Sequence, residues 1–421
     1  MRYVADLHVH SSYARGTSPR LTLENLAAWA KLKGIDLLAT GYFTHPAWLA
    51  ELRAKLSETE GGLFQFGGVR FMLGTEVSCV YQQGGRTRRV HLLLYAPSFA
   101  TVERLNTALA RWGNLSDDAR PTLALSARDL AALAHDADPR CTVIPAHAWT
   151  PWYSVYGSVG GFDSLGECFG DLTGAIPAVE TGLSSDPGMN WRMPELDGKA
   201  IVSFSDAHSL PRLGREATVF DGEITYSGFR LALERQSIAY TVEFYPEEGK
   251  YHFDGHRKCG VHQSPRETLA SPDGMRCPVC RRRLTIGVAH RVEALASRPE
   301  SAVQAGDGLV HDPSGRRPPY RRLVPLQEIV AEALGKGVAT KAVEQAYTRL
   351  VRELGPELTL LQDAPLERIA SVAGERVAEG VERVRRGELV IEPGYDGVYG
   401  TVRIWPDAKR KGREQLSLFG A

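Results

Sequence analysis

The first twelve residues constrain the fold most, because a short apolar segment runs directly into a His-x-His pair, His8 and His10. In an extended strand, residues two apart point to the same face, so both imidazoles can reach one metal ion. An isolated pair of this kind is equally compatible with two packing histidines. The presence of other metal-binding residues at the ends of similar apolar segments decides between these interpretations.

Such recurrence is found along residues 1–245, where apolar segments repeatedly end in residue types that bind metal. These residues are Glu76, His91, His147, Asp206 and His208, and a looser case ends at His45. Helix candidates lie between the segments, the first opened by Thr22 and closed by Gly34. Alternating strands and helices, with polar residues at the strand ends, are typical of the active-site face of an α/β barrel.

The histidine and carboxylate residues together predict a centre for divalent ions such as Zn, Mn, Fe or Mg. Two such ions about 3.5–4 Å apart can activate a water and stabilise the leaving oxygen of a phosphodiester. The residue types do not select one ion.

A second set of metal-type residues follows the barrel. Cys259 is followed, after seventeen residues, by Cys277 and Cys280, and His256 or His262 can supply a fourth ligand. This spacing predicts a closed structural zinc site, and His256 is favoured over His262. The adjoining residues 281–283 are all arginine and can contact phosphates or form a solvated turn.

The composition of the chain restricts where in the cell the protein is expected and which classes of protein it can belong to. The 421 residues carry no formal net charge, which argues against a protein that coats nucleic acid nonspecifically. No apolar run approaches the roughly 20 residues that a membrane span needs, and the start lacks the apolar stretch of a signal peptide. We therefore expect a cytoplasmic protein with no membrane partner, in a compartment where cysteines favour zinc over disulfides.

Changes in pattern divide the chain into four parts. They are a barrel over 1–245, a zinc module over 246–298, a mainly helical domain over 299–405, and a flexible tail over 406–421. Residues 299–325 are rich in turn formers and predict an irregular connection. Helical periodicity follows over 326–334, 340–354 and 365–386. This domain can position DNA or act as a structural support.

The tail contains a short apolar motif after a basic stretch, consisting of Gln415, Leu416, Leu418 and Phe419 around Ser417. Spaced apolar residues on a flexible tail can fill a groove on a partner. The motif resembles the Gln-Leu-Ser/Asp-Leu-Phe peptide by which bacterial replication and repair proteins bind the sliding clamp.

The motifs of the barrel resemble those of the polymerase and histidinol phosphatase (PHP) family. That resemblance implies a distorted seven-stranded (β/α) barrel that hydrolyses phosphoesters, with Glu76 and Asp206 as catalytic ligands. His8, His10 and Asp206 would hold one metal, Glu76 would bridge, and His91 and His147 would hold a second. A third metal would use His45 and His208. Thr44 and residues 14–16 depart from the acidic residues often found at those places in the family.

The whole architecture, with residues 251–257 and 393–400, resembles the endonuclease Q family. This resemblance implies a DNA repair endonuclease that nicks 5′ to uracil, hypoxanthine, xanthine and abasic sites. The damaged nucleotide would be flipped out of the duplex, towards a base pocket lined by Glu180, Ser184 and Tyr81. The aromatic loop 151–157 can stack on such a base or serve as packing. The alternatives are a PHP phosphomonoesterase acting on a small metabolite and a noncatalytic DNA adaptor.

Overall fold

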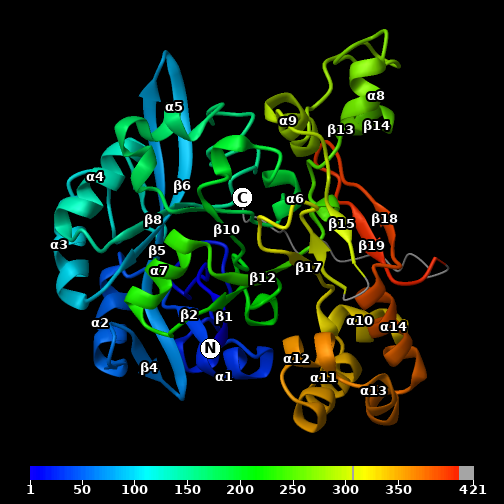
Figure 1. Ribbon diagram of the computed structural model, residues 1–421, viewed down its shortest axis with the longest axis horizontal. Helices are drawn as coiled ribbons and strands as arrows, with labels where there is room; N and C mark the ends of the chain where they lie inside the picture. Colours follow the sequence, from blue (N-terminus) through cyan, green and yellow to red (C-terminus); the bar gives the residue numbers. More distant parts are fainter. Residues whose placement is uncertain (306–307, 407–421) are drawn as a thin grey trace.

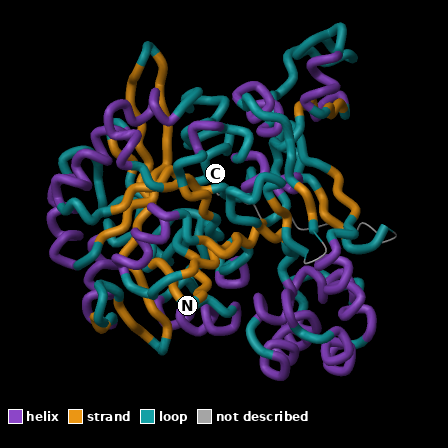
Figure 2. The backbone as a smooth tube through the Cα atoms, viewed as in Figure 1, coloured by secondary structure: helices purple, strands orange, loops and turns teal. Residues whose placement is uncertain are grey.

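The computed structural model describes residues 1–305 and 308–406, so residues 407–421, with the motif expected to bind a clamp, lie outside the described residues. A barrel of strands and helices forms one side of the molecule, with the zinc module and the helical domain on the other side (Figure 1). Figure 2 shows that strands concentrate in the barrel, while the lower unit on the other side is almost entirely helical.

The barrel consists of short strands around a common core. β1 (Arg2–Asp6), β2 (Leu37–Ala39) and β5 (Val69–Gln83) run parallel, and β9 (Ala178–Glu180) is parallel to β10 (Ala200–Val202). β6 (Arg86–Ala96) is antiparallel to both β5 and β8 (Thr142–Pro145), which distorts the barrel. A bridge between Val9 and Ala207 joins the segment after β10 to the segment after β1. The predicted distorted α/β barrel is confirmed.

Helices cover the outside of the barrel: α1 (Leu23–Lys33), α2 (Pro46–Lys55), α3 (Phe99–Leu109), α4 (Ala127–Ala137), α5 (Leu165–Phe169), α6 (Pro187–Asn190) and α7 (Tyr226–Arg235). The first helix forms as its sequence predicts. The Thr22 hydroxyl accepts a hydrogen bond from the Asn25 amide, and Gly34 ends the helix at a φ of 84°. Shorter strands β3 (Ser57–Glu58), β4 (Phe64–Phe66) and β7 (Thr122–Leu123) extend the edge at β5.

On its other edge the sheet continues towards the helical domain. β1 pairs with β11 (Ala217–Asp221), β11 with β12 (Ile238–Glu243), and β12 with β17 (Tyr320–Arg322). β16 (Val310–His311) and β15 (Val303–Gln304) follow. Residues 299–325 are therefore not wholly irregular, as expected from their sequence, but contain three short strands. Strands of two or three residues between Gly and Pro are too short to show an alternating pattern.

The helical domain contains α10 (Leu326–Ala333), α11 (Lys341–Leu354), α12 (Glu357–Asp363), α13 (Leu366–Ala373) and α14 (Glu375–Arg386), followed by the hairpin β18 (Val390–Glu392) and β19 (Thr401–Arg403). The predicted helices are present, but the span 365–386 is divided at Gly374, which adopts a φ of 92°. The short helix α12 begins after Pro356 and ends before Pro365, and it was not predicted.

The zinc module contains β13 (Asp254–His256), β14 (Val261–Gln263), α8 (Pro265–Ala270) and α9 (Val288–Leu295). The loop before β19 completes it: the Asp396 carboxylate accepts hydrogen bonds from the Arg257 amide at 2.6 Å and the Thr285 hydroxyl at 2.5 Å. The Tyr395 ring packs so closely on Gly255 that an added Cβ would lie 2.4 Å from it. The resemblance-bearing segments 251–257 and 393–400 are thus neighbours in space.

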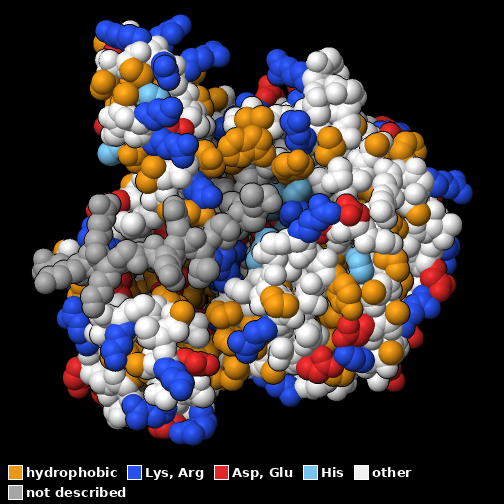
Figure 3. All heavy atoms as spheres, turned by 180° about the vertical axis from the view of Figure 1, so that it is seen from behind, with side chains coloured by type: hydrophobic (Ala, Val, Ile, Leu, Met, Phe, Trp, Pro, Cys, Tyr) orange, Lys and Arg blue, Asp and Glu red, His pale blue; other side chains and the backbone are white. Residues whose placement is uncertain are grey.

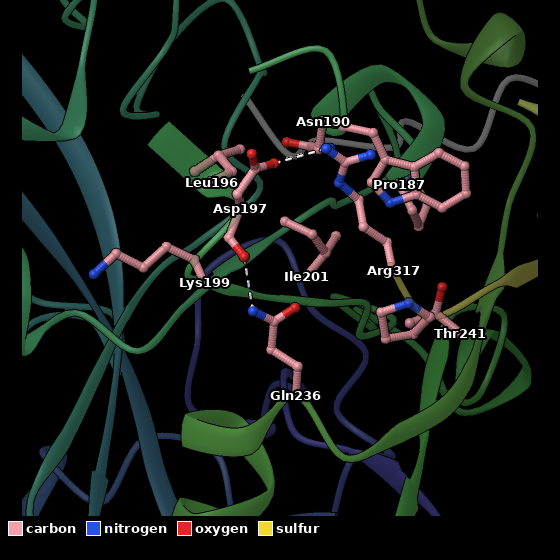
Figure 4. Close-up of a pocket in the computed structure, with 11 residues that line it drawn as sticks. Pro187, Asn190, Leu196, Asp197, Lys199, Ile201, Gln236, Thr241 and Arg317 are labelled. Atoms are coloured by element: carbon pink, nitrogen blue, oxygen red, sulfur yellow. Dashed lines mark hydrogen bonds and ion pairs between the residues drawn. The ribbon is translucent and has the colours of Figure 1, made fainter. Parts of the chain in front are cut away.

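A small pocket lies where Arg317 and Pro318 meet the barrel (Figure 4). The Asp197 carboxylate accepts hydrogen bonds from Arg317 at 2.7 Å and from Arg298. Its backbone oxygen accepts one from the Gln236 side chain at 2.9 Å. These partly exposed ion pairs fix the connection, each contributing about 1 kcal/mol at most.

Among the described residues, no helix is long and apolar enough to cross a membrane.

One buried ion pair connects the barrel to the helical domain. Lys33 Nζ on α1 lies 2.6 Å from a carboxylate oxygen of Glu357 on α12, and both side chains are at most 4% exposed. Glu357 also accepts hydrogen bonds from the Tyr347 hydroxyl at 2.8 Å and from the Leu326 amide at 3.1 Å. Such a pair is costly to break from one side, because the remaining charge stays buried.

The variant Lys33→Met should therefore lower the free energy of unfolding by about 3 kcal/mol, measured by urea titration. The control is Arg53→Met, which removes the cation of the exposed pair with Glu103 and should change the free energy by less than about 1 kcal/mol. Equal effects of the two substitutions would contradict this account of the junction.

Candidate active site

The predicted ligand residues meet at one end of the barrel, and nearly all are buried. His8 and His10 follow β1, Glu76 lies in β5, and His91 lies in β6. The others, His147, Asp206 and His208, follow β8 and β10. His147 and Asp206 have positive φ angles of 30° and 47°. Positive φ in these residues costs about 1–3 kcal/mol each and is typical of functional sites.

The first ligand group contains His8, His10, Glu76 and Asp206, whose ligand atoms lie within 4.8 Å of one another. Asp206 Oδ1 lies 2.5 Å from His10 Nε2 and 3.4 Å from His8 Nε2. Glu76 Oε2 lies 3.4 Å from the same His8 nitrogen. Two carboxylate oxygens and two imidazole nitrogens thus converge on one point.

The second group contains Glu76, His91 and His147. Glu76 Oε1 lies 2.6 Å from His91 Nδ1 and 3.3 Å from His147 Nε2. Glu76 therefore presents one oxygen to each group. This is the arrangement expected of a carboxylate that bridges two ions.

His8 shows that these residues fit a metal. Its Nδ1 donates to the Glu180 carboxylate at 2.9 Å, which leaves Nε2 with its lone pair pointing at the first group. That nitrogen is buried and has no hydrogen-bond partner among the described residues. A carboxylate behind a histidine, with the opposite nitrogen free, is typical of metal ligands.

Charge balance in the site supports the same interpretation. Burial disfavours ionisation of Glu76, but His91, Arg120 and His8 hold its pKa well below the ordinary value. Burial lowers the pKa of His91 to about 4, and burial, with the nearby His208, lowers that of His10 to about 3. Burial opposes protonation of His8, but Glu180, Asp206 and Glu76 raise its pKa well above the ordinary value, so a divalent ion would displace the proton of this ring. Anionic carboxylates and neutral imidazoles are the protonation states that bind divalent ions.

His45 and His208 do not belong to either ligand group among the described residues. His208 donates to the backbone oxygen of Asp206 at 2.9 Å, and its ring lies 3.9 Å from that of His10. His45 caps α2 by accepting from the Trp48 amide at 3.4 Å, and its ring packs against Tyr13. A third metal held by these two residues stays a prediction.

The three residues expected in a base pocket lie in different environments. Glu180 is fully buried behind the ligands, where it accepts from His8 and, at 2.7 Å, from the His147 amide. Tyr81 lies five residues after Glu76 in β5, so the pleat directs it to the opposite face. Ser184 is partly exposed and lies in the turn after β9. Glu180 thus supports the ligands and Tyr81 points away from the face that carries Glu76, while a base pocket formed by the three residues stays a prediction.

Two residues of the site were missed by the sequence analysis. The buried Tyr42 hydroxyl donates to His10 Nδ1 and also lies 3.4 Å from Glu76 Oε2. Arg120 Nη1 lies 3.4 Å from the same Glu76 oxygen. Both come from irregular segments, and Tyr42 has a positive φ of 51°, so no periodic pattern in the sequence marked either residue.

Gly182 is needed for the ligand geometry. It follows Glu180 at a φ of 60°, and an added Cβ would lie 2.3 Å from the Cβ of His147. The missing side chain allows the turn after β9 to pack directly against a ligand residue.

In the space-filling view from behind, histidine side chains are visible in the central part of the face, with Lys and Arg side chains beside them (Figure 3).

The zinc module contains the other ligand group, His256, Cys259, Cys277 and Cys280. Cys280 Sγ lies 3.5 Å from His256 Nδ1. His262 instead packs against the ring of Tyr395, with ring centroids 5.0 Å apart. The structure therefore selects His256, the favoured of the two alternatives, and the four side chains fit a structural zinc site.

Comparison with solved structures identifies the family. The crystal structure of the lesion-specific endonuclease PfuEndoQ from Pyrococcus furiosus is 34% identical, with a TM-score of 0.83, and the match covers 99% of this chain and 98% of that one. The chain belongs to the endonuclease Q family. A second endonuclease Q structure, a complex with a 27-mer duplex carrying an abasic lesion at the active site, is 33% identical with a TM-score of 0.82, covering 99% and 100% of the two chains. The predicted enzyme class, a metal-dependent endonuclease, is confirmed.

Sequence comparisons agree with membership of the endonuclease Q family. The family model of the MJ0043 C-terminal domain matches residues 325–388. The uncharacterised protein YqxK of Bacillus subtilis is 28% identical over 95% of this chain and 98% of its own. The uncharacterised protein MJ0043 of Methanocaldococcus jannaschii is 32% identical over 65% of this chain, a match that spans only 33% of its length.

Removing the charge of Glu180 tests its supporting role. The variant Glu180→Gln should lower affinity for the metal in the barrel by about 10- to 100-fold, because His8 loses its carboxylate partner. Competition with a coloured chelator measures this affinity. The control Glu195→Gln alters a carboxylate that accepts from the Tyr156 hydroxyl at 2.8 Å, away from the ligands, and should retain wild-type affinity. Unchanged metal affinity in Glu180→Gln would exclude the role.

Proposed function

We propose that this protein is a DNA repair endonuclease that nicks the phosphodiester 5′ to abasic sites and to deaminated bases, namely uracil, hypoxanthine and xanthine. The observation that carries the proposal is the pair of ligand groups sharing Glu76, in a chain that matches endonuclease Q structures over its whole length. The abasic duplex bound by a family member supports the choice of substrate class.

In this proposal the barrel residues prepare the site for phosphodiester hydrolysis. His8, His10, Glu76 and Asp206 would hold one divalent ion, and Glu76, His91 and His147 a second. Bound ions supply Lewis acidity and lower the pKa of water. Attack of a water oxygen on phosphorus breaks the bond to the 3′ oxygen, which leaves as a 3′-hydroxyl. The lesion side retains a 5′-phosphate.

The protein's own part in this reaction is orientation. The Glu180 carboxylate accepts a hydrogen bond from His8 Nδ1, which fixes the orientation of the His8 ring. It also accepts one from the His147 amide, which fixes the start of the loop after β8. Thr150 lies 3.0 Å from His147 Nδ1, so the remaining ring nitrogen is directed at Glu76. Fixed rings do not have to reorganise as charge develops during the reaction.

We further propose that the damaged nucleotide is flipped out of the duplex towards this site. Loop 151–157 carries Trp152, which is 39% exposed, and Tyr153, whose ring lies 4.7 Å from that of His91. Trp152 contacts Tyr251 of the zinc module edge to face at 4.9 Å. Exposed aromatic rings beside the ligands can stack on bases, and flipping costs least at mispaired or missing bases.

The tail motif supports a further part of the proposal, tethering to the bacterial sliding clamp. Gln415, Leu416, Leu418 and Phe419 lie outside the described residues, so this part rests on the resemblance of the peptide. Tethering would raise the local concentration of the enzyme at DNA that carries the clamp.

Incubation of the purified protein, with Mg or Mn, on labelled duplexes tests the proposed function. Duplexes with one abasic site, uracil, hypoxanthine or xanthine should be nicked immediately 5′ of the lesion, and an undamaged duplex should stay intact.

The variant Asp206→Asn should lower turnover by at least about 1000-fold, because the ligand 2.5 Å from His10 loses its charge. Its melting temperature should remain close to wild type.

Full activity of Asp206→Asn would contradict the metal mechanism. Intact lesion duplexes together with hydrolysis of a small phosphomonoester would replace the endonuclease with a metabolite phosphatase.

The double variant Leu418→Ala, Phe419→Ala tests the tether. Its affinity for purified bacterial clamp should fall by at least about 10-fold, because the two apolar anchors are lost. Nicking of short lesion duplexes without clamp should not change. The single variant Ser417→Ala is the matched control. Equal clamp binding by the wild type and the double variant would exclude this contact.

A further inference from the structure

We propose that Arg120 binds the scissile phosphate and stabilises the charge that develops on it, an inference that rests on the proposed endonuclease function. Arg120 is a cationic side chain that reaches the ligand groups from outside the strands that carry them. Its position, its free hydrogen-bonding capacity and the charge of the site each support this role.

The backbone around Arg120 is fixed next to the strand that carries Glu76. The Ser78 amide donates to the Pro121 oxygen at 3.0 Å, and Thr122 of β7 is in parallel register with Ser78 of β5. The Arg120 amide itself donates to the Asp118 carboxylate at 3.2 Å. The side chain is therefore delivered to the site by a rigid segment, which limits the entropy lost on binding a substrate.

The guanidinium of Arg120 is only partly used in the protein. Its side chain is 29% exposed, and among the described residues it donates to Glu76 alone, at a long 3.4 Å. Arg215 provides the contrast within the same site. It is buried, and it donates to the backbone oxygens of Ser205 at 2.9 Å and Asp206 at 3.3 Å. Arg120 thus keeps N–H groups that can reach a ligand, whereas Arg215 is engaged in fixing the backbone.

The charge of the site explains why a cation is needed there. Glu76, Asp206 and Glu180 place three carboxylates at one end of the barrel, and an approaching phosphodiester is also an anion. When both oxygens of Glu76 serve as metal ligands, Arg120 loses its one acceptor. Phosphate oxygens then offer a planar guanidinium the paired, charge-assisted hydrogen bonds that it makes best.

A purely structural role, in which Arg120 only holds the Glu76 carboxylate in position, makes different predictions. In that case its loss would weaken metal binding and lower activity in proportion. A phosphate contact would instead lower turnover at constant metal content. It would also make the affinity for DNA depend on the charge of the scissile phosphate.

The experiment uses Arg120→Gln, Arg120→Lys and Arg120→Ala in the full chain, with Arg111→Gln as a control at an exposed arginine nearby. We expect kcat on an abasic duplex to fall by about 100-fold in Arg120→Gln and less in Arg120→Lys, with unchanged metal content. Added guanidinium chloride should restore part of the activity of Arg120→Ala, in contrast to an equal concentration of tetramethylammonium chloride. Arg111→Gln should behave as wild type.

A binding measurement provides a second readout that does not depend on turnover. The duplex carries either a normal or an uncharged methylphosphonate group at the scissile position, and binding is followed by fluorescence anisotropy with Ca²⁺ in place of Mg or Mn, so that metal still occupies Glu76 while turnover is suppressed. The uncharged group should weaken binding by wild type about 10-fold and binding by Arg120→Gln by less than twofold.

Four outcomes would each overturn the phosphate contact. The first two are a wild-type kcat in Arg120→Gln and a loss of metal in parallel with activity. The others are the absence of rescue by guanidinium and an equal methylphosphonate effect in both proteins. A wild-type protein that nicks no lesion duplex would instead overturn the proposed function on which it rests.

Discussion

Three carboxylates buried at one end of a small barrel set the conditions for the rest of this structure. Glu76, Asp206 and Glu180 would be costly to bury if they lacked partners. Histidines that follow β1, β8 and β10 or lie within β6 surround them, together with the guanidinium of Arg120, and Glu76 belongs to both ligand groups. The short strands, the antiparallel β6 and the positive φ angles of His147 and Asp206 bring these side chains together. The distortion of the barrel is thus part of the site.

Much of this site could be predicted from the sequence because its ligands obey a local rule. His8, His91, His147 and Asp206 each lie within or just after a strand, and strand ends of a barrel meet at one face. Tyr42 and Arg120 follow no such rule. They reach Glu76 from irregular segments through contacts distant in sequence. Glu180 was recognised at a strand end, but only its hydrogen bonds to His8 and to the His147 amide show that it supports the ligands.

The same distinction applies to the fold. Long helices such as α11 have enough periodic residues to be predicted, whereas α12 and the strands between residues 303 and 322 are too short for a pattern. The zinc ligands were predicted because cysteine spacing is a strong signal, yet spacing could not distinguish His256 from His262. Their distinction depends on Tyr395, which packs against His262 from a part of the chain more than a hundred residues away.

The contact of Asp396 with Arg257 and Thr285 has a consequence for biosynthesis. Translation delivers all four residues of the Cys/His group to the ribosome exit well before the loop that contains Tyr395 and Asp396. A nascent chain can therefore collect its metal ligands early, but this part of the module must wait for the helical domain to be translated. A chain terminated between residues 300 and 390 would carry an intact set of barrel ligands beside an incompletely packed zinc module. Quality control by proteolysis could recognise such a chain by the edge that residues 393–400 normally cover.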